Sequence, residues 1–428
     1  MKETIMNQPV IYWTSRALRV RDNPALALAQ HLALKQERPL KVVFVVYPHF
    51  PYANQRNMHF LLTGLKEMQS KLASLNIPLE CVLDDPLEYF EKACSSMGVL
   101  VMDHHVLKPV KKVQSKVIEL CQKHHIEHHV VSVATVIPVE MASSKLEFAA
   151  KTIRPKIMKQ YKEWLVESDP IIYHSLNKEV KIKSIDVNHI MKSFPHWKVL
   201  SLSELIPGED AGYKQLRHFI QDGLERYESR NEIPMKAQSY LSAYLHFGMI
   251  SPKVMIKAVE SSQLPASALF VEEALVRREL AENYCHYNEH YDSLEGAWPW
   301  AKKTLLEHAH DKREYLYTLD DFESAQTHDD VWNECMNIIK DKGYLHSYLR
   351  MYWAKMVLYW SDSPQKAIEI LIHLNDTYFL DGRDPNGYTG IMWSVAGVHD
   401  RPWFNRPVIG LIRAMGKEGT LKKTKMKL

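Results

Sequence analysis

The sequence is poor in cysteine and has no long hydrophobic run. It contains five cysteines, which form no CxxC pair and stand far apart at Cys81, Cys94, Cys121, Cys285 and Cys335. A sparse, odd-numbered set predicts a reduced protein inside the cell (cytoplasmic if prokaryotic) and excludes a disulfide framework. The most apolar short stretch, residues 42–46, is far below the roughly 18 residues of a membrane-spanning helix. Residues 1–4 lack the apolar core of a signal peptide, so we expect none.

Glycine is also scarce, and the motifs that use it to bind nucleotides are missing. The 15 glycines form neither GxGxxG nor GxxxxGK[ST], which excludes standard dinucleotide and P-loop sites. No HExxH zinc motif occurs. The histidine-rich run 124–129 is a poor metal site, because neighbouring side chains on a strand point to opposite faces. We interpret it as a helix end followed by an edge strand, and we predict no metal site.

Charge of either sign is balanced, so it does not indicate a partner. The formal net charge is +3, from 54 Lys and Arg against 51 Asp and Glu. A hydrophobic content of 46% over 428 residues predicts a folded protein of two or three domains. Seven of the ten tryptophans lie beyond residue 290, so the second half is built differently from the first.

Short apolar runs alternate with amphipathic helical patterns in the first third of the chain. The expected strands are residues 10–13, 40–47, 79–83, 98–102 and 128–133. Continuous β-branched runs of this kind are typical of a parallel sheet covered on both faces. The fold class is therefore α/β followed by all-α: a doubly wound domain over residues 8–140, a connector over 141–207 and a helical domain over 208–428.

The helical part contains three patterns that point to a ligand or to chemistry. Ser239 and Ser242 place two hydroxyls three residues apart at an expected helix start, where a phosphate can bind. The polar loop 381–388 runs directly into an apolar segment. Trp353 and Trp360 are seven apart, which returns them to nearly the same helix face.

Asp210 is expected to cap a helix that extends to Tyr227. The lysine-rich tail, residues 417–427, is either a solvated end or a contact to nucleic acid.

Five motifs together resemble the class II cyclobutane pyrimidine dimer DNA photolyases. They are YWTSRALRVRDN at 12–23, SYLSAYLHFG at 239–248, RRELAENY at 277–284, LRMYWAK at 349–355 and DGRDPNGYTGIMWSVAGVHDR at 381–401. They cover nearly the whole chain in the order expected of that family.

The resemblance implies a light-driven lyase with non-covalently bound FAD in its helical domain. The reduced, anionic FAD would donate an electron to a cyclobutane pyrimidine dimer that has been flipped out of damaged DNA. An antenna chromophore in the α/β domain, a deazaflavin or a folate, and an empty site all stay open. No membrane and no obligate protein partner are implied.

The resemblance also assigns roles by motif position. FAD binding falls to Tyr227, Ser239, Leu241, Ser242, Asn375, Asp381 and Asn386. The catalytic set is Glu273, Asn375, Arg350 and Asp381, in which either Asn375 or Asn386 faces flavin N5. The lesion would contact Glu273, Arg277, Met351 and Trp393, although some relatives have an aromatic residue at the position of Arg277. Electron transfer falls to Trp353 and Trp360, with Trp332 as a third candidate.

Two other functions are weighed against this one. A cryptochrome-like photoreceptor would use the same flavin module for signalling, and we would expect it to have a long C-terminal extension, whereas this chain ends some fifteen residues past 411–413. An unrelated adenine-nucleotide-binding protein would leave the two tryptophans and the Arg350/Asp381 combination unexplained. Specificity for 6-4 photoproducts would call for histidine acid/base chemistry at the lesion, which the resemblance does not supply.

Overall fold

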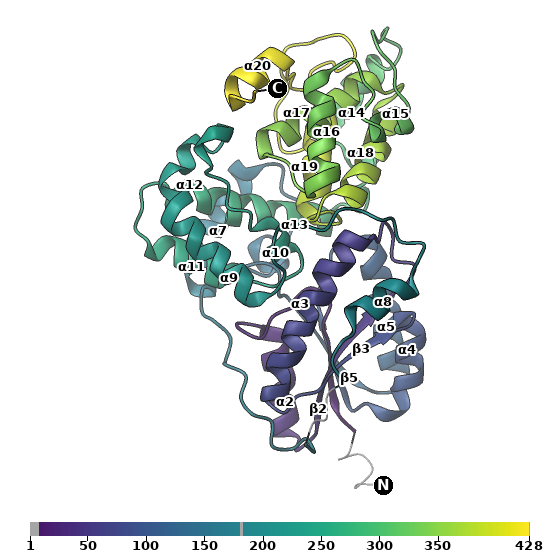
Figure 1. The fold of residues 1–428 in the computed structure, drawn as a ribbon, viewed down its shortest axis with the longest axis vertical. Helices are drawn as coiled ribbons and strands as arrows, with labels where there is room; N and C mark the ends of the chain where they lie inside the picture. The colour runs from purple at the N-terminus through teal and green to yellow at the C-terminus, as the bar shows by residue number, and fades with distance from the viewer. Residues whose placement is uncertain (1–7, 180–182, 428) are drawn as a thin grey trace.

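A five-stranded parallel sheet forms the N-terminal part of the protein (Figure 1). The computed structural model describes residues 8–179 and 183–427, so the expectation about a signal peptide at residues 1–4 lies outside the described residues. The strand order is β3-β2-β1-β4-β5. The strands are β1 Val10–Trp13, β2 Leu40–Val46, β3 Leu79–Leu83, β4 Val99–Asp103 and β5 Glu127–Val131. All five predicted strands are confirmed within two residues at either end.

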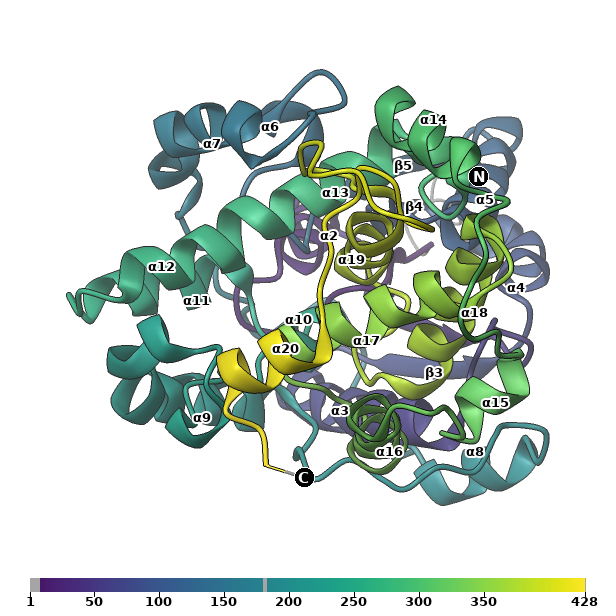
Figure 2. The same ribbon diagram turned by 90° about the horizontal axis from the view of Figure 1, so that it is seen from above.

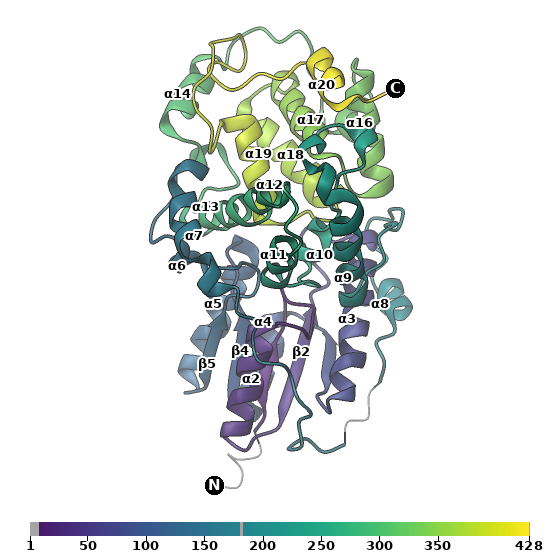
Figure 3. The same ribbon diagram turned by 90° about the vertical axis from the view of Figure 1, so that its left-hand side faces the viewer.

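Helices cover both faces of this sheet, as the continuous apolar runs predicted. On β1, Val10 and Tyr12 pack on one side, and Ile11 and Trp13 pack on the other. The first face carries α2 and α3, and the second carries α4 and α5 (Figure 3). These helices are α2 Pro24–Lys35, α3 Gln55–Ser74, α4 Pro86–Ala93 and α5 Lys108–Lys123.

The carboxyl ends of β1 and β4 attach the sheet to the helical part. Strand order reverses between these two strands, and doubly wound folds bind ligands at that crevice. Here Asp103 accepts hydrogen bonds from the backbone N–H groups of Ser15 and Arg16, at 2.8 and 2.7 Å. Arg16 in turn forms an ion pair with the buried Glu282 of helix α13. The crevice is thus used for contact between the two parts of the chain.

The segment predicted to be a connector runs along the side of the sheet (Figure 1). Helix α6 Val139–Ala142 spans its start, and its described residues also include α7 Ala150–Trp164 and α8 Val187–Ser193. Its extended stretch is fastened by hydrogen bonds: Asn177 bonds to both backbone groups of Leu40, and Gln69 accepts from the backbone of Ile185.

The rest of the described chain is helical (Figure 2). The helices are α9 Glu209–His218, α10 Ser242–His246, α11 Pro252–Ser261, α12 Ser267–Val271, α13 Arg278–Tyr287, α14 Pro299–Glu307, α15 Leu319–Glu323, α16 Asp330–Lys342, α17 Ser347–Trp360, α18 Pro364–Tyr378, α19 Pro385–Ala396 and α20 Lys417–Thr424. One apolar core joins the α2/α3 face of the sheet to α9–α12, and a second lies among α14–α19.

Two expectations about this part were wrong. Asp210 is not a cap: α9 begins at Glu209 after Gly208, and Asp210 forms an ion pair with Lys71 of α3 at 2.6 Å. The helix also does not run regularly to Tyr227, because it passes into a π turn, Phe219–Gly223, and a 3-10 turn, Leu224–Ser229.

The lysine-rich tail is neither extended nor detached. It forms α20, which lies against α17. Its hydroxyl side chains Thr420 and Thr424 are buried, and Lys425 pairs with Glu232 at 2.6 Å. No helix in the described ranges has the length and apolar character needed to cross a membrane.

Candidate functional site

Arg350 on α17 stands at the centre of the candidate site. Its Nη1 donates to both carboxylate oxygens of Asp381, at 3.1 and 3.3 Å, and its Nη2 donates to Asn375 Oδ1 at 2.5 Å. The guanidinium also lies over the ring of Phe379, 3.9 Å from the centroid. Three predicted residues, from α17, α18 and the loop after α18, therefore meet in one cluster. The remaining space around Asp381 is the candidate ligand site.

The amide of Asn375 is held at both ends. It is 1% exposed, and its Nδ2 donates to Asp376 Oδ1 at 2.7 Å. Asp376 also accepts from the backbone N–H of Arg383 and the hydroxyl of Tyr388. At Gly387, a Cβ atom would lie 2.9 Å from Asn375 Nδ2, so glycine lets α19 approach this amide closely. The orientation of Asn375 is thus fixed by its neighbours.

Asn386 occupies a different environment. It is exposed in the first turn of α19, and its side chain donates to Asp384 Oδ1 at 2.8 Å. Burial alone would raise the pKa of Asp384, but the charge of Arg278 and hydrogen bonds from His246 and Asn386 lower it well below the usual range. Within the described residues Asn386 makes no hydrogen bond to the Arg350 cluster.

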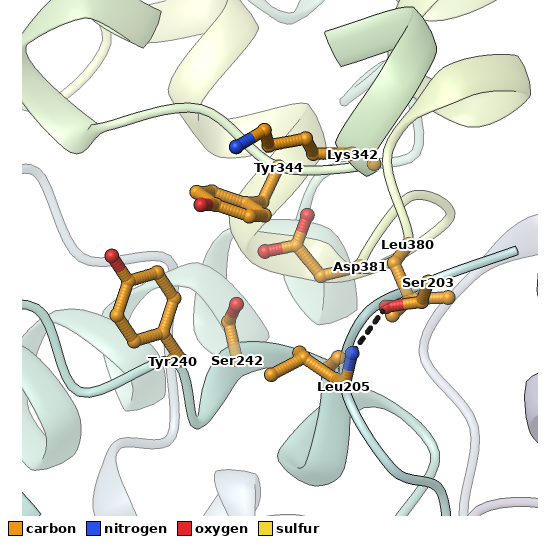
Figure 4. Close-up of a pocket in the computed structure, with 10 residues that line it drawn as sticks. Ser203, Leu205, Tyr240, Ser242, Lys342, Tyr344, Leu380 and Asp381 are labelled. Carbon is orange, nitrogen blue, oxygen red and sulfur yellow. Dashed lines mark hydrogen bonds between the residues drawn. The ribbon is translucent and has the colours of Figure 1, made fainter. Parts of the chain in front are cut away.

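A pocket next to the cluster is lined by both Ser242 and Asp381 (Figure 4). Ser242 is the first residue of α10. Lys342, the last residue of α16, and Tyr344, two residues later, also line the pocket. Of the other predicted residues, Ser239 lies three residues before α10, where its carbonyl accepts from Gln215 at 2.9 Å, and Leu241 is buried in the core. The pocket therefore joins the SYLSAYLHFG motif to the DGRDPNGY loop.

Tyr227 and Glu273 meet through Arg230, a residue that sequence reasoning missed. The Arg230 guanidinium lies 5.1 Å from the Tyr227 ring centroid, and its Nη2 donates to Glu273 Oε1 at 3.3 Å. Glu273 and Arg277 both belong to a π turn, Glu272–Arg277, between α12 and α13. Such turns are frequent at functional sites. Arg277 instead pairs with Glu272 at 3.2 Å, and both Glu273 and Arg277 are exposed.

Trp393 on α19 has two cations close to its ring. Lys355 Nζ is 5.4 Å and the Arg413 guanidinium 5.8 Å from an indole centroid of Trp393. Met351 lies one helical turn before Lys355 on α17 and so shares its face. Lys355 is buried and donates to the carbonyl oxygen of Ser394, and its burial lowers the pKa of its ammonium group to about 7. Met351 and Trp393 thus flank one side of α17.

The rings of the three predicted tryptophans lie in a row. Trp332 of α16 lies between the other two, with ring centroids 6.2 Å from Trp353 and 6.2 Å from Trp360. Trp353 contacts Phe379 at 5.8 Å, and Phe379 lies beneath Arg350. At the other end, Trp360 borders a cavity of about 500 Å³ that also contacts Lys312 and Arg406. Helical periodicity alone paired Trp353 with Trp360, whereas the structure inserts Trp332 between them.

The histidine-rich run is confirmed as a helix end and an edge strand. His124 directly follows α5, and β5 lies at the edge of the sheet. The ring of His129 pairs with Glu127 at 2.8 Å.

Comparison with known proteins places the whole chain in one family. The sequence profile described as DNA photolyase matches residues 10–172. A deoxyribodipyrimidine photo-lyase of Arabidopsis thaliana is 38% identical over 97% of this chain and 86% of the relative. One of Potorous tridactylus is 40% identical over 97% of this chain and 80% of the relative. The chain belongs to the DNA photolyase family.

The photolyase fold is also found by structural comparison. An archaeal photolyase from Sulfolobus tokodaii, solved with two FAD molecules, superposes with a TM-score of 0.73 at 16% identity. The alignment covers 96% of this chain and 86% of the other. At that identity the match concerns the fold alone. It agrees with the predicted α/β sheet followed by helices.

Three residues of the candidate site were not found from the sequence: Arg230, Asp376 and Lys355. Arg230 lies outside every quoted motif, and its partners are 3 and 43 residues away. Lys355 ends the motif at 349–355, and Asp376 directly follows Asn375. Neither was singled out, because in the sequence each looks like an ordinary polar residue on a helix. Only the packing of α17, α18 and α19 shows that both are buried.

Proposed function

We propose that this chain splits cyclobutane pyrimidine dimers in DNA with light energy, the activity carried by the name of its 36–40% identical relatives. The observation that carries the proposal is the Arg350–Asn375–Asp381 cluster together with the chain of indoles that leads from it. The Arg350 cation, the Asn375 amide and the Asp381 carboxylate are fixed at one end of the row of tryptophan rings. A redox cofactor bound beside them would have a fixed charge on one side and a path for electrons on the other.

The residues around the pocket fit FAD. Ser242 lines the pocket and offers a hydroxyl to the phosphates or ribityl chain, and Ser239, Tyr227 and Leu241 are assigned to the same cofactor by their motif positions. Asn375 Oδ1 accepts from Arg350 but retains a second lone pair, so it can still accept a hydrogen bond from flavin N5. When bound in its reduced anionic form, FAD supplies the electron that light transfers to the dimer.

Arg350 would stabilise negative charge on the bound flavin. Its guanidinium is a fixed positive charge that favours a negatively charged ring system beside it, and Asp381 holds it in place. We assign Asn375, and not Asn386, to flavin N5, because Asn375 is bonded to Arg350 while Asn386 is bonded to Asp384. Asn386 would then order the loop that precedes α19, and its effect on the cofactor would be indirect, through that loop.

The proposed lesion surface combines apolar and charged side chains. Met351 and Trp393 would pack against the flipped pyrimidines, and the exposed Arg413 near Trp393 would attract the DNA backbone. Glu273 would hydrogen-bond the carbonyl edge of the dimer and stabilise its radical anion. Because Glu273 is paired with Arg230, it would exchange that partner for the lesion. Arg277 is exposed and would contact phosphate or stack on a base.

The experiment is light-dependent repair by the purified protein. The substrate is an oligonucleotide with one cyclobutane thymine dimer, and FAD in the protein is reduced chemically before illumination. We expect recovery of pyrimidine absorbance in the light, none in the dark, and none with a 6-4 photoproduct. Bound FAD without light-dependent repair would contradict the proposal and favour a photoreceptor.

An action spectrum with a violet maximum beyond the flavin bands would identify an antenna chromophore, whose chemical nature stays open between a deazaflavin and a folate.

A further inference from the structure

Two histidines and a glutamate meet where the sheet, the connector and helix α13 come together. His104 directly follows β4, Glu140 lies in the short helix α6, and His286 lies in the last turn of α13. One nitrogen from each imidazole and one carboxylate oxygen lie within 4.8 Å of one another. Three segments that are far apart in the sequence thus bring together three side chains of the kind that bind metals.

We propose that these three residues, the His104 site, bind a divalent transition-metal ion such as Zn²⁺. Imidazole and carboxylate are the ligand types that this ion prefers, and three protein ligands leave a fourth position for water. Ligand atoms bonded at 2.0–2.1 Å to a tetrahedral ion lie about 3.4 Å apart. His286 Nε2 and Glu140 Oε1 are already 3.5 Å apart.

The surroundings leave both imidazoles available to an ion. His286 would bind the ion through Nε2, the nitrogen that faces Glu140, and its other ring nitrogen, Nδ1, is buried without a hydrogen-bond partner within the described residues. The rings of His104 and His286 face each other at 5.6 Å and 50°, so they are not stacked flat. Glu140 is two-thirds exposed, and its carboxylate can close the remaining distance without displacing packed residues.

The charges around the cluster are balanced. Arg16 donates to the backbone carbonyl of His104 at 3.2 Å, but it is neutralised by its ion pair with Glu282. Lys111 of α5 is the other cation whose charge acts on His286, and Glu140 and Glu282 oppose it. An ion bound here would tie the sheet to α6 and α13 and would stabilise the junction between the two parts of the chain. This inference does not depend on the proposed function.

Calorimetric titration of the full-length protein tests the site. The protein keeps its FAD, carries no affinity tag and is freed of metal by a chelator before Zn²⁺ is added. We expect one Zn²⁺ per chain and a higher melting temperature with Zn²⁺. Mg²⁺ should produce neither effect, because it prefers oxygen ligands. An absence of Zn²⁺ binding would overturn the proposal.

Three variants show whether these residues hold the ion. His104→Ala, His286→Ala and Glu140→Gln should each weaken Zn²⁺ binding about tenfold or more. Glu140→Gln is the safest of these for the fold, because its side chain is exposed. The control is the double variant His124→Ala with His125→Ala, in the exposed histidine run, which should bind Zn²⁺ as the parent does. Unchanged binding by Glu140→Gln and His286→Ala, or loss of binding in the control, would contradict the assignment.

Discussion

Glu279 is a buried carboxyl group of α13 that holds the segment following β5. It is 2% exposed, and its Oε1 accepts hydrogen bonds from the backbone N–H groups of Val136 and Ile137, at 3.0 and 2.9 Å. Its Oε2 is buried without a partner within the described residues. Burial, reinforced by the charge of Glu282, raises the pKa of Glu279 from 4.5 to about 8.

This raised pKa predicts a stability that falls as the pH rises. Between pH 4.5 and about 8 the folded protein keeps a proton on Glu279 that the unfolded chain has lost, so the free energy of unfolding decreases across that window. Glu279→Gln keeps the acceptor oxygen and removes the titration. We expect the melting temperature of the parent to drop more than that of the variant between about pH 6 and about pH 9.

Thermal unfolding followed by circular dichroism measures this difference. The control is Glu289→Gln, an exposed residue in the loop after α13, which should follow the parent at each pH. If Glu279→Gln lost stability with rising pH as steeply as the parent, ionisation of Glu279 would not be the cause.

At the scale of single residues, the candidate site was partly predictable from the sequence. Arg350, Asn375 and Asp381 were assigned by motif position, and the structure brings all three together. The choice between Asn375 and Asn386 could not be made from spacing, because both asparagines follow Arg350 at plausible distances in the sequence. It depends on which amide lies beside the guanidinium, and that is a property of how α18 and α19 pack.

At the scale of elements, the sheet was the most predictable part. Its three central strands, β1, β2 and β4, are apolar runs buried on both faces, so each run is visible in the sequence without knowledge of its partners, whereas the edge strands β3 and β5 are partly exposed. The segment after Gly208 was predicted less well. Its apolar spacing is helical, but the chain passes through π and 3-10 turns near Tyr227, and local periodicity does not reveal such a change.

The indole chain depends on the packing of two helices, α16 and α17. Trp353 and Trp360 share one face of α17, and α16 inserts Trp332 between them, where its Nε1 also donates to the backbone carbonyl of Trp353 at 2.9 Å. Periodicity within α17 cannot show a side chain that comes from another helix. We therefore regard Trp332 as the middle member of the proposed path.

Trp332→Phe should interrupt that path without removing the site. We expect photoreduction of the oxidised protein to slow at least tenfold, while chemically reduced protein repairs dimers as the parent does. Transient absorption after a laser flash measures the first quantity, and the oligonucleotide assay measures the second. Trp300→Phe, which lies outside the chain, serves as the control. Equal losses in both assays would mean that Trp332 supports the fold and carries no electron.

At the scale of the whole molecule, Arg56 of α3 joins the α/β part to the helical part. It is 1% exposed, and its guanidinium donates to the backbone carbonyls of Ile339 and Tyr378 at 3.1 and 2.9 Å. It also reaches the carbonyls of Lys340, Asp341 and Ser201. Carbonyls at the end of a helix lack partners within that helix, so this one side chain satisfies the ends of α16 and α18 together.

Arg56→Met should therefore loosen the two parts against each other. Leaving several buried carbonyls unpaired is expected to lower the free energy of unfolding by about 3–5 kcal/mol. Gly343, which lines the pocket beside Asp381, packs directly on Arg56, so the proposed FAD site should lose affinity in the same variant. Denaturant unfolding and the flavin absorbance of the purified protein measure the two effects. Lys66→Met, exposed on the same helix, should change neither. A variant that is less stable but retains its full flavin content would show that Arg56 holds the parts together without shaping the pocket.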